Sequence, residues 1–217
     1  MFIIVGNLNF VPGKYDEWQA AYRELEKYVI DNERESTLSY YFGVPEEYGH
    51  GMSKSTQMIA FEAYNVREDL YETHFHSKAM DKFLATVPAL MTTGLDLTHY
   101  ENASGFLDKP GDRKECGIIY DTRITAKEGK RDEVLGRLAK LAQWAEKNVD
   151  DTYTFLVLKS LDNDTQVRVF ERYATRKALE AHQSAKEVLD FFMSSKDIIA
   201  SVEARGYTPN GAGWLHR

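Results

Sequence analysis

Hydrophobic residues near the start of the chain follow two different periods. The run from Phe2 to Phe10 is short, apolar and β-branched, and Pro12-Gly13 closes it, so it predicts a strand followed by a turn. The next apolar residues recur at spacings of four, three and four, which is typical of an amphipathic helix reaching to about residue 32. They are Trp18, Tyr22, Leu25 and Val29.

The following segments complete one folding unit. Residues 37–44 and 57–64 are rich in aromatic and β-branched side chains and predict two strands, and residues 95–101 predict another. Residues 67–87 are helical in composition, with a break near Ser77, which can cap a second helix. The order strand, helix, strand, strand, helix, strand is that of the ferredoxin-like (split βαβ) unit.

The same unit occurs a second time. Pro-Gly-Lys-Tyr-Asp-Glu at 12–17 returns as Glu-Gly-Lys-Arg-Asp-Glu at 128–133, 116 positions later. Phe-Glu-Ala-Tyr at 61–64 returns as Phe-Glu-Arg-Tyr at 170–173, at an offset of 109. A changing offset means that loops of different length join matched elements, so the chain is a tandem duplication.

The duplication sets the expected domain boundaries. We expect a first repeat over residues 1–102 and a second over 116–208. A linker over 103–115, marked by Pro110-Gly111, separates them, and residues 209–217 form a tail.

Each repeat leaves one sheet face without helices. Such a face is an exposed apolar surface unless something packs on it. We therefore expect an α+β fold in which two tandem ferredoxin-like repeats pack sheet to sheet as an intrachain α+β barrel, with a cavity between sheet and helices in each half.

Composition and charge narrow the class of protein. The 217 residues are 43% hydrophobic and 28% charged, as in ordinary globular proteins. A net charge of −7, with Lys and Arg scattered among acids, argues against a nucleic-acid surface. The N-terminal apolar run is too short for a signal peptide or a membrane span, and Cys116 is the only cysteine. We expect a cytoplasmic protein that binds neither nucleic acid nor membranes.

The repeated motifs resemble the antibiotic biosynthesis monooxygenase family, within the dimeric α+β barrel superfamily. The resemblance covers nearly the whole chain. It is carried by the Gly-Lys opening of each first helix, by each Phe-Glu-x-Tyr strand ending near Arg67 or Arg176, and by three matched residues in each following helix. These are His74, Ser77 and Phe83 in the first repeat and His182, Ser184 and Phe191 in the second.

The resemblance implies an activity without a cofactor. Members of the family oxidise polycyclic phenols with molecular oxygen, needing neither metal nor flavin, after the pocket deprotonates the substrate. We therefore expect a cofactor-independent monooxygenase acting on a hydrophobic phenolic or enolisable small molecule, with O2 as co-substrate and a homodimer left open. The segment after Ser77 lacks the His that haem-degrading members use there. A non-catalytic small-molecule-binding or stress-response barrel, and an isomerase or decarboxylase of the same superfamily, stay open as alternatives.

Two residue types suit catalysis in the first repeat. Asn7 and Asn9 share one face of the first strand, where amides could hold a substrate oxygen or stabilise an oxyanion. His74 lies at the joint between two helical pieces, and an imidazole has a pKa suited to a general base near neutral pH. We expect Asn7 and His74 to be catalytic and Asn9 to bind substrate.

Further aromatic residues are candidates for the pocket wall. Tyr40, Tyr64 and Tyr100 lie on predicted strands, and His76 follows His74 by two positions. We expect these four to contact substrate, although each phenol could equally be a core residue, and no metal signature accompanies the histidines. In the second repeat, Asp121 and Arg123 replace the amides of the first strand, and Arg168 and Arg172 lie on the third strand. These charges suggest a filled or salt-bridged cavity, so we expect a single working site in the first half.

Overall fold

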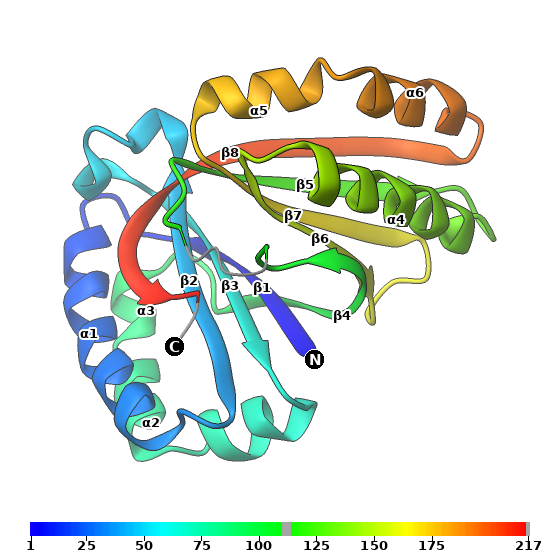
Figure 1. Ribbon diagram of the computed structural model, residues 1–217. Helices are drawn as coiled ribbons and strands as arrows, with labels where there is room; N and C mark the ends of the chain where they lie inside the picture. The colour runs from blue at the N-terminus through cyan, green and yellow to red at the C-terminus, as the bar shows by residue number, and fades with distance from the viewer. Residues whose placement is uncertain (110–113, 216–217) are drawn as a thin grey trace. The chain divides into compact units, whose positions relative to one another are not determined.

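The computed structural model describes residues 1–109 and 114–215. They form two compact units, one made of residues 1–99 and the segment from Thr208 onward, the other of residues 100–207. The predicted fold class is confirmed: the chain is α+β and contains two tandem ferredoxin-like repeats (Figure 1). No described helix is long and apolar enough to cross a membrane.

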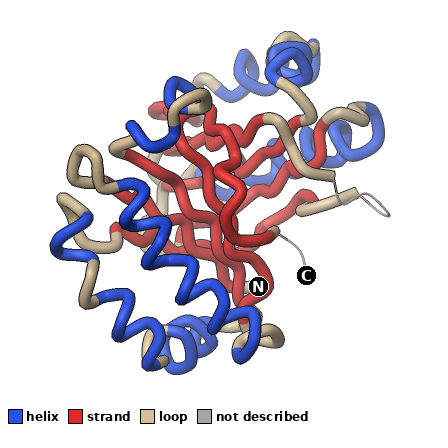
Figure 2. The backbone as a smooth tube through the Cα atoms, turned by 90° about the vertical axis from the view of Figure 1, so that its left-hand side faces the viewer, coloured by secondary structure: helices blue, strands red, loops and turns tan. Residues whose placement is uncertain are grey.

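In the first unit, three strands form the centre of an antiparallel sheet. Strand β3 (Gln57–Tyr64) pairs with β1 (Phe2–Asn9) on one side and β2 (Thr37–Pro45) on the other. Helices α1 (Tyr15–Asn32) and α2 (Lys78–Leu84) lie on one face of these strands (Figure 2). A π-helical turn over Asp69–His74 and the short α3 (Val87–Leu90) flank α2. The predicted break is confirmed, since the Ser77 hydroxyl caps α2 by accepting from the Met80 amide.

The second unit repeats the pattern. Strand β7 (Gln166–Tyr173) pairs with β5 (Ile118–Ala126) and β6 (Thr152–Ser160). Helices α4 (Arg131–Asn148), α5 (Arg176–Gln183) and α6 (Lys186–Ser195) cover one face of this sheet. The chain turns between Ser184 and Ala185, so α5 and α6 are separate helices.

Two long strands each contribute residues to both units. Hydrogen-bonded strands follow the order β1-β3-β2-β8-β5-β7-β6-β4, so β4 (Asp96–Phe106) neighbours β1 and β6, and β8 (Ile199–Trp214) neighbours β5 and β2. This differs from the sequence-based boundaries. The expected linker begins inside β4, and most of the expected tail continues β8, because their backbone groups find ladder partners. Pro110-Gly111, which marked the linker, lie outside the described residues.

The helix-covered core differs in size between the repeats. In the first repeat it is aromatic: the rings of Trp18 and Tyr22 stack at 5.3 Å, and Phe42 and Phe83 meet Trp18 edge to face. In the second repeat the matched positions of the first helix, Val134 and Leu138, are smaller, and the strand position that matches Phe42 is Val157. Replacing rings with short aliphatic chains leaves volume unfilled between sheet and helices.

Close backbone approach makes one glycine irreplaceable in β4. Gly105 has φ +88° beside a register shift, and an added Cβ would lie 2.0 Å from the Phe155 carbonyl oxygen. Gly129, in the turn before α4, also has a positive φ, but a Cβ added there would meet nothing within 4 Å. The two glycines therefore separate backbone strain from steric overlap.

We expect Gly105→Ala to destabilise the protein by about 3 kcal/mol or more, since it adds a backbone clash to the left-handed strain. Gly129→Ala carries the strain alone and should cost about 1–2 kcal/mol. Urea unfolding of both variants measures the difference. Equal losses would show that β4 can shift away from β6 without penalty.

Candidate functional site

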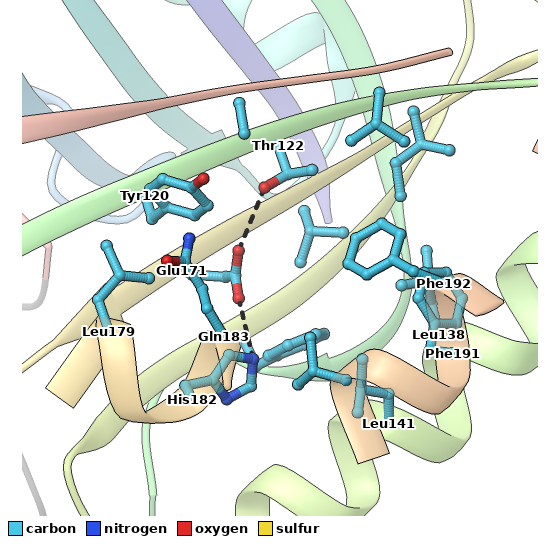
Figure 3. Close-up of a pocket in the computed structure, with 16 residues that line it drawn as sticks. Tyr120, Thr122, Leu138, Leu141, Glu171, Leu179, His182, Gln183, Phe191 and Phe192 are labelled. Atoms are coloured by element: carbon cyan, nitrogen blue, oxygen red, sulfur yellow. Dashed lines mark hydrogen bonds and ion pairs between the residues drawn. The ribbon is translucent and has the colours of Figure 1, made fainter. Parts of the chain in front are cut away.

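A cavity of about 130 Å³ lies between the sheet and the helices of the second repeat (Figure 3). Its wall is mainly apolar, and a few polar groups enter from β5, β7 and α5. The lining residues are Tyr120, Thr122, Ile124, Leu138, Leu141, Phe155, Val169, Glu171, Leu179, His182, Gln183, Val188, Phe191, Phe192, Val202 and Ala204. An apolar cleft with a few convergent polar groups is the usual form of a small-molecule site.

Glu171 is the acidic group of this cavity. Its side chain leaves β7 and is 5% exposed. The Tyr173 hydroxyl donates to Oε1 at 2.6 Å, and the Thr122 hydroxyl donates to Oε2 at 3.4 Å. Burial raises the pKa of Glu171 to about 8, although both hydrogen bonds act in the opposite direction. The carboxyl group is therefore mostly protonated at pH 7 and can exchange a proton near neutrality.

His182 stands beside this carboxyl group. Its Nε2 lies 3.7 Å from Glu171 Oε1, and the side chain is 4% exposed. Burial lowers the pKa of His182 to about 4, so the imidazole is neutral at pH 7. Its Nδ1 has no hydrogen-bond partner in the described part of the chain. At pH 7 a neutral imidazole therefore lies beside a mostly protonated carboxyl group, and the carboxylate is the stronger base of the two.

The first repeat has the matching carboxyl, phenol and imidazole groups but lacks, among the described residues, a comparable cavity beside them. Glu62 and Tyr64 match Glu171 and Tyr173, and the Tyr64 hydroxyl donates to Glu62 Oε2 at 2.7 Å. Burial raises the pKa of Glu62 to about 7, and the nearby charge of His74 opposes the rise. Nδ1 of His74 lies 2.6 Å from Glu33 Oε2, with both side chains buried.

Glu33 explains a difference between the two histidines. It is the C-cap residue of α1, and the residue at the C-cap of α4 is Val149. The second repeat therefore lacks the carboxylate that holds the imidazole in the first repeat, and this loss leaves Nδ1 of His182 without a partner among the described residues. The fixed pair in the first repeat has become a single imidazole facing a cavity.

Asn7 and Asn9, the candidate residues of β1, lie on the face of the strand that points away from the helices. Leu8 and Phe10 pack against the helices, so Asn7 and Asn9 belong to the opposite row. The Asn7 amide donates to Asp96 Oδ2 at 3.1 Å, and the Asn9 carbonyl oxygen accepts from Thr92. Asn7 borders a cavity of about 20 Å³, which is enough for a single water molecule.

The other candidates lie in three different places. Tyr40 and Tyr64 are buried and flank His74 in the aromatic core, where their ring centroids lie 5.6 and 6.1 Å from the imidazole. His76 is exposed and its Nδ1 lies 3.7 Å from Glu72. Tyr100 belongs to the second unit, where its hydroxyl accepts from Arg168 at 3.2 Å. The structure therefore brings together His74, Tyr40 and Tyr64, but gives them no substrate-sized space.

The expectation that Arg168 and Asp121 block the second cavity is corrected by the structure. Arg168 forms a bidentate pair with Asp121, at 2.5 Å to Oδ1 and 2.7 Å to Oδ2. Both residues alternate with cavity-lining neighbours on their strands, so the pair lies on the sheet face away from the helices. The cavity stays open.

Glu171 was not among the residues predicted for the site, although it belongs to the repeated Phe-Glu-x-Tyr motif. The Phe-Glu-x-Tyr motif places a carboxyl group on the same strand face as a tyrosine two positions later. Because that face is covered by helices, the motif signals a buried and therefore perturbed carboxyl group. Among residues 1–109 and 114–215, no group of three or more His, Cys, Asp or Glu side chains could hold a metal ion.

Comparisons with known proteins agree with this architecture. Residues 118–193, which make up most of the second repeat, match the sequence profile of the family described as antibiotic biosynthesis monooxygenase. No curated protein sequence matches the chain.

Solved structures extend the likeness to the whole chain. A candidate monooxygenase from Fusobacterium nucleatum subsp. nucleatum ATCC 25586 has a TM-score of 0.81 and 17% identity, covering 100% of this chain and 96% of that one. A candidate monooxygenase from Lactobacillus acidophilus NCFM has a TM-score of 0.79 and 11% identity, covering 99% and 96%. An anthrone oxidase-like protein has a TM-score of 0.65 and 18% identity, covering 96% and 91%. At these identities, the likeness shows a shared fold.

The buried acid makes stability depend on pH. Glu171 keeps its proton up to about pH 8 in the folded chain, against an ordinary value of 4.5, so the folded state binds more protons in between and unfolding becomes easier as pH rises. His182 acts in the opposite direction, but only between about pH 4 and its ordinary value of 6.5. We expect Glu171→Gln to remove up to about 1.4 kcal/mol per pH unit of this slope between pH 6.5 and 8.

Urea unfolding at several pH values in that window measures the slope. Glu62→Gln is the matched control, because the pKa of Glu62 is about 7 and its contribution ends at lower pH. A wild-type slope that persists unchanged in Glu171→Gln would show that Glu171 is ionised throughout.

Proposed function

We propose that the second repeat, which matches the profile of the antibiotic biosynthesis monooxygenase family, catalyses cofactor-independent oxidation of a hydrophobic phenolic or enolisable small molecule by O2. The observation that carries the proposal is the carboxyl group of Glu171, with a pKa of about 8, on the wall of an apolar cavity. A general base works best when its pKa lies near the operating pH, and Glu171 meets that condition without a metal or a flavin.

The reaction begins with proton removal. Ionised Glu171 takes a proton from an O–H, or from a C–H next to a carbonyl, and the substrate becomes an electron-rich anion. The apolar wall contributed by Leu138, Leu141 and Phe155 excludes water, so the anion stays reactive. The newly protonated carboxyl group of Glu171 then donates a hydrogen bond to the substrate anion. A protonated acid in an apolar site can stabilise negative charge in this way.

Oxygen reacts with this anion directly. The anion transfers one electron to O2, and the resulting radical and superoxide combine to form a carbon–oxygen bond. The peroxide anion takes back the proton from Glu171, and the hydroperoxide loses water to leave a carbonyl group. One O2 is consumed and one H2O is released. A CH2 next to a carbonyl becomes a C=O, or a phenol with a free ring CH becomes a quinone, so atoms and electrons balance with O2 as the only co-substrate.

Two neighbours hold the base in place. The Tyr173 hydroxyl fixes one carboxyl oxygen of Glu171, and its own pKa is raised well above the ordinary value by burial, so it stays a donor. Neutral His182 lies 3.7 Å from the same oxygen and stays uncharged, because burial lowers its pKa to about 4. We therefore assign both the removal and the return of the proton to Glu171, and the positioning of its carboxyl group to Tyr173 and His182.

Turnover should depend on ionised Glu171. We expect kcat/KM to rise about tenfold per pH unit below pH 8 and to level off above it, because the rate follows the fraction of ionised base. Glu171→Gln should lower turnover by about 10² or more, since an amide cannot accept the proton. Oxygen uptake with a panel of phenols, hydroxyquinones and anthrones measures both effects.

Glu62→Gln in the first repeat is the matched control and should leave turnover within about twofold of wild type. His182→Asn should slow turnover while keeping the pH midpoint near that of Glu171. Full turnover in Glu171→Gln, or a large loss in Glu62→Gln, would move the site out of the second repeat.

A further inference from the structure

We infer that the cavity of the second repeat selects compounds with a single six-membered ring, whose acidic group meets Glu171 and whose apolar substituent leaves the cavity between Phe192 and Val202. The inference rests on the proposed function of the same cavity and goes further, because it names the shape of the substrate.

Volume limits the ring system. The cavity measures about 130 Å³. Apolar protein cavities of about 150 Å³ bind one benzene molecule. Two or three fused rings would need a larger space or a displaced wall, and the wall is made of residues packed between sheet and helices, which move only at a cost.

Polarity sets the orientation of the ring. The polar groups Thr122, Glu171 and His182 enter from β5, β7 and α5, and the Thr122 hydroxyl and His182 both approach the Glu171 carboxyl group. In Figure 3 Phe191 and Phe192 lie together on one side of the labelled residues, and Glu171 and Gln183 lie on the other. A ring placed between them therefore meets a proton-exchanging group at one end and only apolar side chains at the other.

The mouth of the cavity is itself apolar. Phe192 and Val202 line the cavity and yet are 39% and 40% exposed to solvent, so they lie where it opens. Val202 lies on β8 opposite Ile124, a lining residue of β5, and this pairing continues the apolar wall outward. Large apolar side chains at an opening usually mark a binding surface. An apolar chain attached to the ring, opposite its acidic group, would cover both.

The test is a binding series measured without oxygen, so that affinity is separated from turnover. Phenol and 4-alkylphenols from methyl to butyl are titrated into the whole protein by calorimetry, alongside 2-naphthol and anthrone. We expect affinity to rise about two- to fourfold per added methylene, the range for a partly to fully buried CH2. The fused-ring compounds should bind at least tenfold more weakly than 4-butylphenol.

Two variants examine the mouth and the cavity. Phe192→Ser should flatten the dependence of affinity on chain length, and Ile30→Ser, at an exposed position of the first repeat, should leave that dependence unchanged. Leu138→Tyr, which copies Tyr22 of the first repeat, should fill the cavity and abolish binding. Leu138→Tyr could also disturb folding, so its melting curve is measured. If Leu138→Tyr is unfolded, Phe192→Ser alone decides the question.

Preference for anthrone, or a chain-length dependence that survives in Phe192→Ser, would overturn the inference. Other outcomes would contradict the proposed function and the shape assignment one at a time. If the alkylphenols bind as expected but no compound of the panel of phenols, hydroxyquinones and anthrones consumes oxygen, the oxidation is rejected and the shape assignment stays. Oxygen uptake with anthrone, without binding of alkylphenols, would keep the oxidation and reject the shape.

Discussion

A carboxyl group held away from water at the same position in both repeats is the constraint that shapes this protein. An unpaired buried carboxylate is costly, so the group must take up a proton, find a cation or stay close to water. Glu62 and Glu171 each accept a hydrogen bond from the tyrosine two positions later, and burial raises the pKa of both. The side chains around each carboxyl group then decide whether a ligand has room beside it.

The two repeats differ in how they surround it. The first repeat closes its space with Trp18, Tyr22 and Phe42 and holds His74 against Glu33, so its acid has no room for a ligand. The second repeat has shorter side chains on α4 and no counterpart of Glu33. Having two repeats thus allows one to keep a filled core and the other to keep an open cavity, which a single repeat cannot do at once. A filled aromatic core stabilises the fold, and an open cavity leaves room for a ligand beside Glu171.

Much of the fold could be predicted from the sequence, because it depends on local periods that repeat. The strand and helix order, the duplication and the cap at Ser77 all follow from spacing and from short-range hydrogen bonds. The continuation of β4 past residue 102 and of β8 to Trp214 could not, since it depends on ladder partners far away in the sequence.

The site was harder to predict for a related reason. Asn7 and His74 were sensible candidates by residue type, but catalysis needs space, and space depends on the sum of side-chain volumes across elements. The contrast between Trp18 and Val134 at matched helix positions was visible in the sequence. Its consequence, an open cavity beside Glu171 and a cavity of about 20 Å³ in the first repeat, required the packed structure.

Infrared spectroscopy measures directly whether Glu171 is a protonated acid at neutral pH. A difference titration of the carboxylic C=O stretch from pH 5 to 9 compares wild type with Glu171→Gln. We expect a band that disappears with a midpoint near pH 8 and is missing from the variant. Identical spectra of the two proteins above pH 6 would mean that Glu171 is already ionised and cannot be the protonated acid described above.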